Sequence, residues 1–468
     1  MRYISTRGSA PALDFADAML TGLARDGGLY VPESWPRFSA DEIAALAGLD
    51  YAEVAYRVTR PFIGAALDDG TYRAMVEQTY RVFTHSAVAP LVELAPNHWL
   101  MELFHGPTLA FKDYAMQLLG NLFNHILGAR GRRVTIIGAT SGDTGSAAIE
   151  ACRGREAIDI FILFPHGRVS DVQRRQMTCV DDANVHAMAI DGSFDDCQAL
   201  LKDMFNDPNF RDEVAMSGVN SINWARILGQ IVYYFVAAAA LGGGDRKIAF
   251  AVPTGNFGNI YAGYAAREMG LPISHLVLAT NANDILSNLL ATGTMTQGPV
   301  HASLSPSMDI QVASNFERYL FDLLDRDGRA VAQQMAAYRD TGELALSPDA
   351  LGTAREVFTG FRLDDAGTLE EIGRRYDASG QLLDPHSAIG VAAGAAKRFE
   401  ASVPMVSLAT AHPAKFPDAV EQATGIRPPL PAHMADLMER TERFDVLAND
   451  LAAVQGFVRD RLAEREVA

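Results

Sequence analysis

The sequence predicts an α/β fold with two lobes, in which parallel sheets are flanked by helices. The chain has 468 residues, which is too long for one average domain. Short apolar, β-branched runs alternate with helical patterns between residues 134 and 205, as expected for a parallel sheet covered on both faces. Glycine-containing turns follow several of these strands, at the edge where such sheets bind ligands.

A helix is predicted to begin near residue 111 and to place one lysine in its first turn. Its apolar positions are Phe111, Tyr114, Ala115, Leu118, Leu119, Leu122, Phe123, Ile126 and Leu127, and Gly128 ends the pattern. The partial positive charge of a helix start disfavours a protonated amine, so the neutral, nucleophilic form of Lys112 becomes accessible. A neutral lysine can form a Schiff base with an aldehyde cofactor. The alternative is an ordinary surface lysine.

The first strand of the alternating region, residues 134–137, leads into the turn Thr140-Ser-Gly-Asp-Thr-Gly145 and a helix over 146–152. Free N–H groups and the hydroxyls of Thr140, Ser141 and Thr144 can bind an anion there, such as a substrate carboxylate. A simple N-cap with a tight turn is the alternative. Further strands are predicted over 158–164 and 184–190, and further helices over 171–177 and 195–205.

Two later segments suggest phosphate binding. The first, Asn220-Ser-Ile-Asn-Trp-Ala-Arg226, precedes an apolar helix over 227–241 and offers amide, hydroxyl and guanidinium donors. Its alternative is an Asn/Ser helix cap with a surface arginine. The second is a glycine-rich turn between a strand over 247–252 and a helix over 260–269, whose N–H groups can form a phosphate nest.

Near the C-terminus, a strand over 404–408 leads to Thr410. The segment Asp384-Pro-His-Ser-Ala388 precedes this strand in the chain. Its His386 is either an acid or base or, more simply, part of a helix cap. Residues 280–370 are predicted to be helical and polar, with no evident chemistry, and residues 430–468 are predicted to form a charged amphipathic helix.

Composition excludes several classes of function. A net charge of −17 argues against nucleic-acid and anionic-membrane partners. Three cysteines without metal-type spacing fit a reduced protein, and no signal-peptide pattern is present, so we expect a cytoplasmic protein without a metal.

Several of these motifs together resemble one family. HGPTLAFKD, TSGDTG, NSINWAR, GNFGN, DPHSA and TAHPAKF, the last similar to the family's THPAKF, occur in the order found in threonine synthases, which are fold type II enzymes dependent on pyridoxal phosphate. STRG and FADAMLTGLARDGGLYVPE near the start resemble the N-terminal domain of the bacterial and fungal class. The resemblance implies an N-terminal domain over 1–92, a two-lobed catalytic region over 93–430 and a helical tail over 431–468.

The resemblance also implies the reaction, which converts O-phospho-L-homoserine and water to L-threonine and phosphate. Lys112 would hold the cofactor and act as the base. The remaining cofactor-binding residues would be Asp143, Gly255, Asn256, Phe257, Gly258 and Thr410, and the substrate-binding residues Thr140, Ser141, Thr144, Asn220, Ser221 and Arg226. Thr410 would face the ring nitrogen of the cofactor.

Asp143 stands where many fold type II enzymes have asparagine, beside the phenolic oxygen of the cofactor. Two anions would repel there, so Asp143 is either protonated or directed elsewhere.

Two alternatives stay open at this stage. One is a pyridoxal-phosphate phospho-lyase or dehydratase that gives a 2-keto acid, and the other is a non-catalytic binder of phosphorylated ligands. The expected partner is a small-molecule substrate, O-phosphohomoserine, and the expected state is a monomer or weak homodimer.

Overall fold

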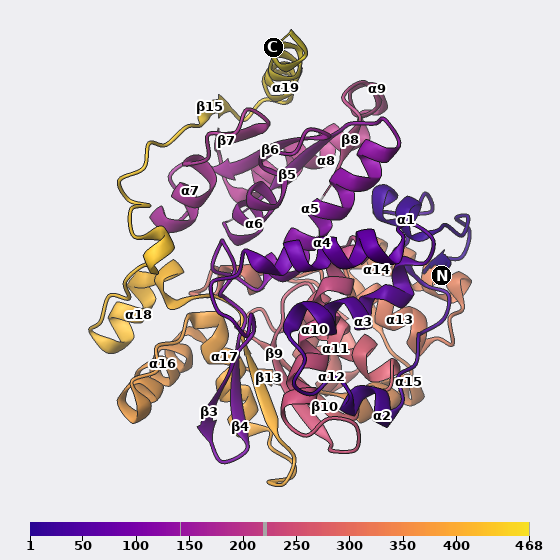
Figure 1. The fold of residues 1–468 in the computed structure, drawn as a ribbon, viewed down its shortest axis with the longest axis vertical. Helices are drawn as coiled ribbons and strands as arrows, with labels where there is room; N and C mark the ends of the chain where they lie inside the picture. Colours follow the sequence, from indigo (N-terminus) through magenta and orange to yellow (C-terminus); the bar gives the residue numbers. More distant parts are fainter. Residues whose placement is uncertain (141, 219–221, 468) are drawn as a thin grey trace. The chain divides into compact units, whose positions relative to one another are not determined.

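The computed structural model describes residues 1–140, 142–218 and 222–467, and the chain divides into two compact units. Unit 1 comprises Met1–Ala115 and Ser221–Pro428, and unit 2 comprises Met116–Asn220 and Pro429–Ala468. Each unit contains a sheet of mainly parallel strands flanked by helices, which confirms the predicted fold class (Figure 1).

Unit 1 is built on a six-stranded sheet with the order β13-β10-β9-β14-β4-β3. All neighbours are parallel except the hairpin of β3 and β4. The strands are β3 (Leu91–Ala95), β4 (His98–Glu102), β9 (Ile248–Pro253), β10 (Ile273–Thr280), β13 (Phe358–Arg362) and β14 (Met405–Ala409). Every residue of β9 and β14 is buried, because helices cover both faces and select continuous apolar strands.

The helices of unit 1 pack around this sheet and around the N-terminal segment. They are α1 (Phe15–Thr21), α2 (Ala40–Ala44), α3 (Tyr51–Ile63), α4 (Asp69–Arg81), α10 (Trp224–Ala240), α11 (Gly258–Glu268), α12 (Ile285–Thr292), α13 (Phe316–Leu323), α14 (Gly328–Thr341), α15 (Pro348–Val357), α16 (Asp365–Ser379), α17 (Pro385–Ala396) and α18 (Pro417–Thr424), with short 3-10 turns η1 (Pro306–Met308) and η2 (Pro413–Lys415). Two small antiparallel pairs complete the unit: β1 (Tyr3–Ser5) with β2 (Tyr30–Pro32), and β11 (Thr294–Thr296) with β12 (Glu343–Ala345).

Unit 2 is a five-stranded parallel sheet with the order β15-β7-β6-β5-β8. Its elements are β5 (Val134–Ala139), α6 (Asp143–Cys152), β6 (Ile158–Pro165), α7 (Asp171–Thr178), β7 (Val185–Asp191), α8 (Phe194–Asn206), α9 (Pro208–Glu213), β8 (Met216–Ser217), η3 (Ala432–Met434), β15 (Asp445–Ala448) and α19 (Leu451–Val467). Apolar side chains of α8 and α19 pack on one face of this sheet and form a core cluster with its central strands.

Helix α5 (Lys112–Ala129) begins one residue after the predicted start and ends one residue after Gly128, which confirms the most important element of the sequence prediction. Helix α10 begins three residues earlier than predicted, so Arg226 lies inside its first turn. The predicted helical tail is wrong over residues 430–450, where the chain forms η3 and the edge strand β15 before α19 begins. The region from 280 to 370 also contains three strands, so it is not purely helical.

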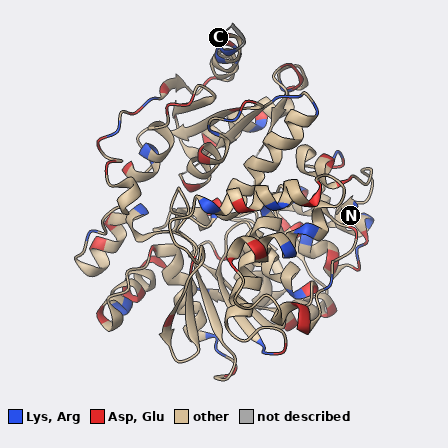
Figure 2. Ribbon diagram, viewed as in Figure 1, with Lys and Arg blue, Asp and Glu red and all other residues tan. Residues whose placement is uncertain are grey.

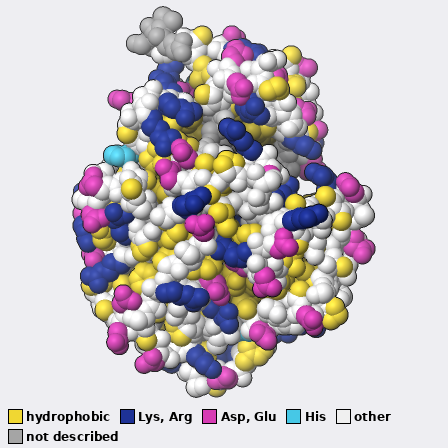
Figure 3. Space-filling model, turned by 90° about the vertical axis from the view of Figure 1, so that its right-hand side faces the viewer, with side chains coloured by type: hydrophobic (Ala, Val, Ile, Leu, Met, Phe, Trp, Pro, Cys, Tyr) yellow, Lys and Arg dark blue, Asp and Glu magenta, His cyan; other side chains and the backbone are white. Residues whose placement is uncertain are grey.

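Charged side chains lie mostly on helices and loops, while the central strands carry few (Figure 2). On the face drawn in Figure 3, acidic and basic side chains are interspersed and no large patch of one sign is present. Among the described residues, no helix is long and apolar enough to cross a membrane, and no group of three His, Cys, Asp or Glu side chains could hold a metal ion.

Buried His98 on β4 gives the stability of unit 1 a defined pH dependence. Its Nε2 lies 2.9 Å from the Ser407 hydroxyl of β14. Burial, followed by the charges of three arginines, lowers the pKa of His98 to about 4. In the unfolded chain a histidine titrates near 6.5, so between about pH 6.5 and 4 only the unfolded chain gains a proton at this position. The contribution of His98 is therefore complete above pH 6.5 and is lost as the pH falls.

We expect His98→Gln to remove this dependence, because the amide can donate to Ser407 but does not titrate. Between pH 7 and 4.5 the parent should lose roughly 2 to 3 kcal/mol more unfolding free energy than the variant. Denaturant unfolding followed by tryptophan fluorescence measures this, since Trp35, Trp99 and Trp224 all lie in unit 1. Substitution of exposed His301 by Gln is the control. Identical pH profiles for the parent and His98→Gln would contradict the assignment.

Candidate active site

The turn before Lys112 is fixed by two buried charged side chains. The carboxylate of Asp113 accepts hydrogen bonds from the backbone N of Thr108 at 2.8 Å and from its hydroxyl at 2.6 Å. The amine of Lys415 donates to the Thr108 carbonyl at 2.7 Å. A Cβ at Gly106 would lie 2.5 Å from the Asp113 carboxylate, so only glycine fits there. These contacts hold the first turn of α5 in one position.

Lys112 is the first residue of α5 and is 7% exposed. Its amine lies 5.4 Å from the centre of the Phe111 ring and donates to the Ser307 hydroxyl at 3.3 Å. Ser307 belongs to η1, about 195 positions along the chain. Among the described residues, the only other buried lysine is Lys415, whose amine donates to the Thr108 carbonyl. Lys112 is therefore the buried lysine best placed to meet a ligand.

Thr410 lies beside this turn. It follows β14 and is 5% exposed. Its carbonyl accepts from the N–H of Phe111 at 2.9 Å, and its own N–H donates to the Ser387 hydroxyl at 3.0 Å. An antiparallel bridge between Ala110 and Ala411 continues this pairing. The segments that carry Lys112 and Thr410 are thus neighbours within unit 1.

The glycine-rich turn joins β9 to α11. Phe257 adopts a left-handed conformation with φ of 61°, and its buried ring packs against Phe316, Tyr319 and Phe358. No side chain caps the start of α11, so its first backbone N–H groups are available to an anion.

Neighbouring segments pack tightly against the glycine-rich turn between β9 and α11. A Cβ at Gly255 would lie 2.7 Å from the Ser307 carbonyl oxygen, and the Asn256 carbonyl accepts from the N–H of Asn315 at 3.1 Å. A rigid nest of N–H donors and a buried amine in the same unit fit the phosphate and the aldehyde of the predicted cofactor.

Arg226 lies in the first turn of α10 and is 4% exposed. Burial lowers its pKa to about 10, so the guanidinium stays charged at neutral pH. The helix is capped by Asn223, which accepts from the N–H of Ala225 at 3.0 Å and donates to the carbonyl of Met19 at 2.8 Å. A buried cation at a helix start is a strong site for an anion. The predicted residues Asn220 and Ser221 lie outside the described part of the chain.

The predicted carboxylate turn belongs to unit 2. The hydroxyl oxygen of Thr140 accepts from the N–H groups of Gly142, at 3.0 Å, and of Gly145, at 2.9 Å, so this side chain holds the turn itself. Gly142, at the N-cap position of helix α6, has no side chain, so Thr140 supplies the side-chain acceptor at the start of this helix. Thr144 lies in the first turn and is half-buried. Ser141 is outside the described residues.

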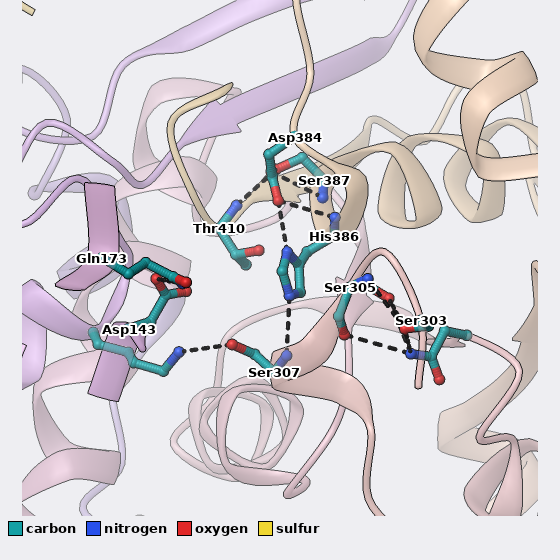
Figure 4. A network of polar contacts seen from close by, with 11 residues as sticks. Asp143, Gln173, Ser303, Ser305, Ser307, Asp384, His386, Ser387 and Thr410 are labelled. Carbon is teal, nitrogen blue, oxygen red and sulfur yellow. Dashed lines mark hydrogen bonds and ion pairs between the residues drawn. The ribbon is translucent and has the colours of Figure 1, made fainter. Parts of the chain in front are cut away.

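Asp143 is directed toward Gln173 in unit 2 (Figure 4). The Gln173 amide donates to the Asp143 carboxylate at 2.9 Å, and Asp143 is 5% exposed. Gly142 permits this contact, because a Cβ there would lie 2.5 Å from the Gln173 side chain, and its φ is 146°. The sequence left open whether Asp143 is protonated or directed elsewhere. In the structure its carboxylate accepts a hydrogen bond from a neutral side chain, the amide of Gln173.

Sequence reasoning missed Ser307 and Ser387, which contact predicted site residues. Ser307 lies in a region where no chemistry was evident, and no local pattern marks it. Ser387 was within a recognised motif, DPHSA, and its position after the N-cap residue Asp384 is the signal that could have found it.

Three family models together span nearly the whole chain. The model for the threonine synthase N terminus matches residues 2–80, that for pyridoxal-phosphate dependent enzymes matches 82–347, and that for the threonine synthase C-terminal region matches 387–458. A threonine synthase of Pseudomonas aeruginosa is 57% identical, over 98% of both chains. The chain belongs to the threonine synthase family.

Further threonine synthases agree with this assignment. That of Methylobacillus glycogenes is 41% identical over 99% of this chain and 100% of its own. The crystal structure of pyridoxal-phosphate-bound threonine synthase from Brucella melitensis is 54% identical, with a TM-score of 0.97 and coverage of 98% of this chain and 99% of its own. The yeast threonine synthase structure is 37% identical, with a TM-score of 0.94 and coverage of 99% of both chains. The predicted enzyme class, threonine synthase, and its cofactor, pyridoxal phosphate, are confirmed.

Proposed function

We propose that this enzyme converts O-phospho-L-homoserine and water to L-threonine and phosphate. The observation that carries the proposal is that two buried basic side chains of unit 1, the amine of Lys112 and the guanidinium of Arg226, each lie in the first turn of a helix. An amine can bind the cofactor aldehyde, and a buried guanidinium can bind the phosphate of the substrate in fork geometry.

The cofactor phosphate is assigned to the turn of Gly255, Asn256, Phe257 and Gly258, whose N–H groups open α11. Thr410 is assigned to the ring nitrogen, since it lies beside the segment that carries Lys112. A hydroxyl is a weak partner that leaves this nitrogen mostly unprotonated. When bound, pyridoxal phosphate supplies an electron sink for charge that develops on the substrate carbons.

Lys112 performs the proton transfers. As a free amine it takes protons from the α- and β-carbons of the substrate, and after phosphate has left it returns protons to the γ-carbon, which becomes a methyl group, and to the α-carbon. The γ-carbon to oxygen bond breaks and phosphate leaves. Water adds its oxygen to the β-carbon, which gives the hydroxyl of threonine.

The remaining assignments concern the ends of the substrate. Arg226, with Asn220 and Ser221 before it in the chain, binds the substrate phosphate and retains it after cleavage, where it can carry protons. Thr140, Ser141 and Thr144 belong to the turn that binds the substrate carboxylate, at the start of α6. Asp143 is assigned to cofactor binding. Its hydrogen bond with Gln173 holds its side chain in one position.

The domain boundaries at residues 92 and 430, a cytoplasmic location and a monomeric or weakly dimeric state are part of the same proposal. They follow from the family resemblance and from composition.

The decisive prediction concerns the product. In water labelled with oxygen-18, O-phosphohomoserine should give threonine whose hydroxyl oxygen comes from the solvent, with an equal amount of phosphate. Mass spectrometry of the amino acid and a phosphate assay measure this. 2-Oxobutyrate and ammonia as main products would instead identify a lyase that stops after elimination. Threonine without the label would contradict the addition of water while leaving the cofactor assignment intact.

A further inference from the structure

A chain of hydrogen bonds joins the fully buried carboxylate of Asp384 to Lys112 (Figure 4). Asp384 caps the start of α17 and accepts from Nδ1 of His386 at 2.7 Å. Nε2 of His386 lies 3.3 Å from the backbone N of Ser307. The Ser307 hydroxyl accepts from the amine of Lys112 at 3.3 Å. All four residues belong to unit 1.

These contacts define the tautomer of His386. The backbone N–H of Ser307 can only donate, so Nε2 must accept and carries no proton. Nδ1 then carries the proton and donates it to Asp384, as in other sites where a carboxylate orients an imidazole. His386 is 4% exposed, so water does not compete for either nitrogen.

The Asp384 carboxylate also accepts a second set of hydrogen bonds, through its other oxygen. Its Oδ1 accepts from the N–H of Ser387, at 3.1 Å, and from the Ser387 hydroxyl. Because that hydroxyl donates to Asp384, its oxygen is free to accept from the N–H of Thr410. The Thr410 carbonyl in turn accepts from the N–H of Phe111, the residue before Lys112. One carboxylate therefore supports both the backbone and the amine of Lys112.

The loop that carries Ser307 is braced from its other side. The amide of Asn281 donates to Ser303, Ser305 and Asp309 at 2.8, 2.9 and 2.7 Å. The Ser307 carbonyl packs against Gly255, as described above. The loop is thus held between α17 and the glycine-rich turn.

We propose that Asp384, His386 and Ser307 are positioning residues for the catalytic amine. The Ser307 hydroxyl holds the Lys112 amine whenever it is not bonded to the cofactor, and Asp384 with His386 holds Ser307 in place. This inference rests on the proposed role of Lys112.

The chemistry explains why the contact is a hydroxyl. A carboxylate beside the amine would favour its protonated form, which cannot act as base or nucleophile. A neutral hydroxyl orients the amine with a much smaller preference for charge, and the carboxylate stays at the far end of a neutral imidazole. Without this contact, a side chain with four methylene groups would sample several rotamers before each proton transfer.

The first test uses cofactor uptake by the apoenzyme, which does not depend on turnover. Addition of pyridoxal phosphate should show a rapid docking phase and a slower phase in which the bond to Lys112 forms, both visible by absorbance. Ser307→Ala should slow the second phase about fivefold, because a neutral hydrogen bond contributes about 1 kcal/mol, and should leave the first unchanged. Ser307→Thr, which keeps the hydroxyl, should restore the rate. Ser379→Ala, at an exposed serine at the end of α16 in unit 1, is the control.

Turnover and NMR give independent measurements. Ser307→Ala should lower kcat about fivefold with little change in KM. In protein labelled with nitrogen-15 histidine, the signal absent from His386→Gln should show a proton on Nδ1 and none on Nε2. A parental bond-forming rate in Ser307→Ala, an equal loss in Ser379→Ala, or a proton on Nε2 would overturn the inference. If the parent fails to make threonine but these uptake and NMR results hold, the proposed function fails and the positioning role stands.

Discussion

Lys112→Ala is expected to fold, to bind pyridoxal phosphate only non-covalently and to lose at least about 10³-fold in kcat, because the same amine is the covalent anchor and the base. No other lysine can replace it. Lys415 is buried, but its amine is engaged by the Thr108 carbonyl; Lys202 and Lys247 are exposed, and half-buried Lys397 lies at the opposite end of α17 from Asp384.

Borohydride reduction of the holoenzyme followed by peptide mapping checks this prediction. The label should appear on Lys112 in the parent and be absent from the variant. Lys247→Ala is the matched control, and its labelling should equal that of the parent. A label on Lys415 would show that the cofactor is anchored on the other buried lysine, and the site would then have to be rebuilt around Thr108.

Arg226→Leu is expected to cost on the order of 2 to 4 kcal/mol of substrate binding, or roughly 30- to 1,000-fold in kcat/KM. The reason is that leucine fills a similar volume but cannot form the charge-assisted fork. The absorbance of the bound cofactor should not change, since its phosphate is assigned to the separate turn at Gly255. Burial already lowers the pKa of Arg226, so its replacement should not destabilise the fold by a comparable amount.

Steady-state kinetics with O-phosphohomoserine measure the effect. Arg226→Lys should recover part of it, because a lysine restores the charge without the planar fork. Arg339→Leu, at an exposed arginine of unit 1, is the control. Unchanged kcat/KM in Arg226→Leu would show that the substrate phosphate binds elsewhere.

The parallel α/β elements could be predicted from the sequence because each has its own local signal. Strand β6 is a run of apolar residues buried on both faces, and α5 has a regular apolar face that ends at a glycine. The predictions failed where tertiary contacts decide the structure. Strand β15 is short and half-exposed, and it forms only because β7 offers an unpaired edge.

The residues of the candidate site show the same difference between those with a local sequence signal and those that depend on tertiary contacts. Lys112, Arg226, the glycine-rich turn and Thr410 are each marked by a short motif at an element boundary. Ser307 has no such motif, because its contact with Lys112 joins residues that are far apart in the sequence. The orientation of the Asp143 side chain also could not be predicted from the sequence, because its partner Gln173 lies on the next helix, α7.

The strand order of unit 1 has a consequence for how the polypeptide folds as it is synthesised. Strand β14 occupies the middle of the six-stranded sheet, between β9 and β4, although it is the last of the six to be made. Until residue 409 has been translated, the hairpin of β3 and β4 and the trio of β9, β10 and β13 cannot be joined into one sheet, and each exposes an unpaired edge. Such non-local closure is slow and leaves edges open to wrong partners. The nascent chain therefore spends most of its synthesis time in a state that needs protection from aggregation.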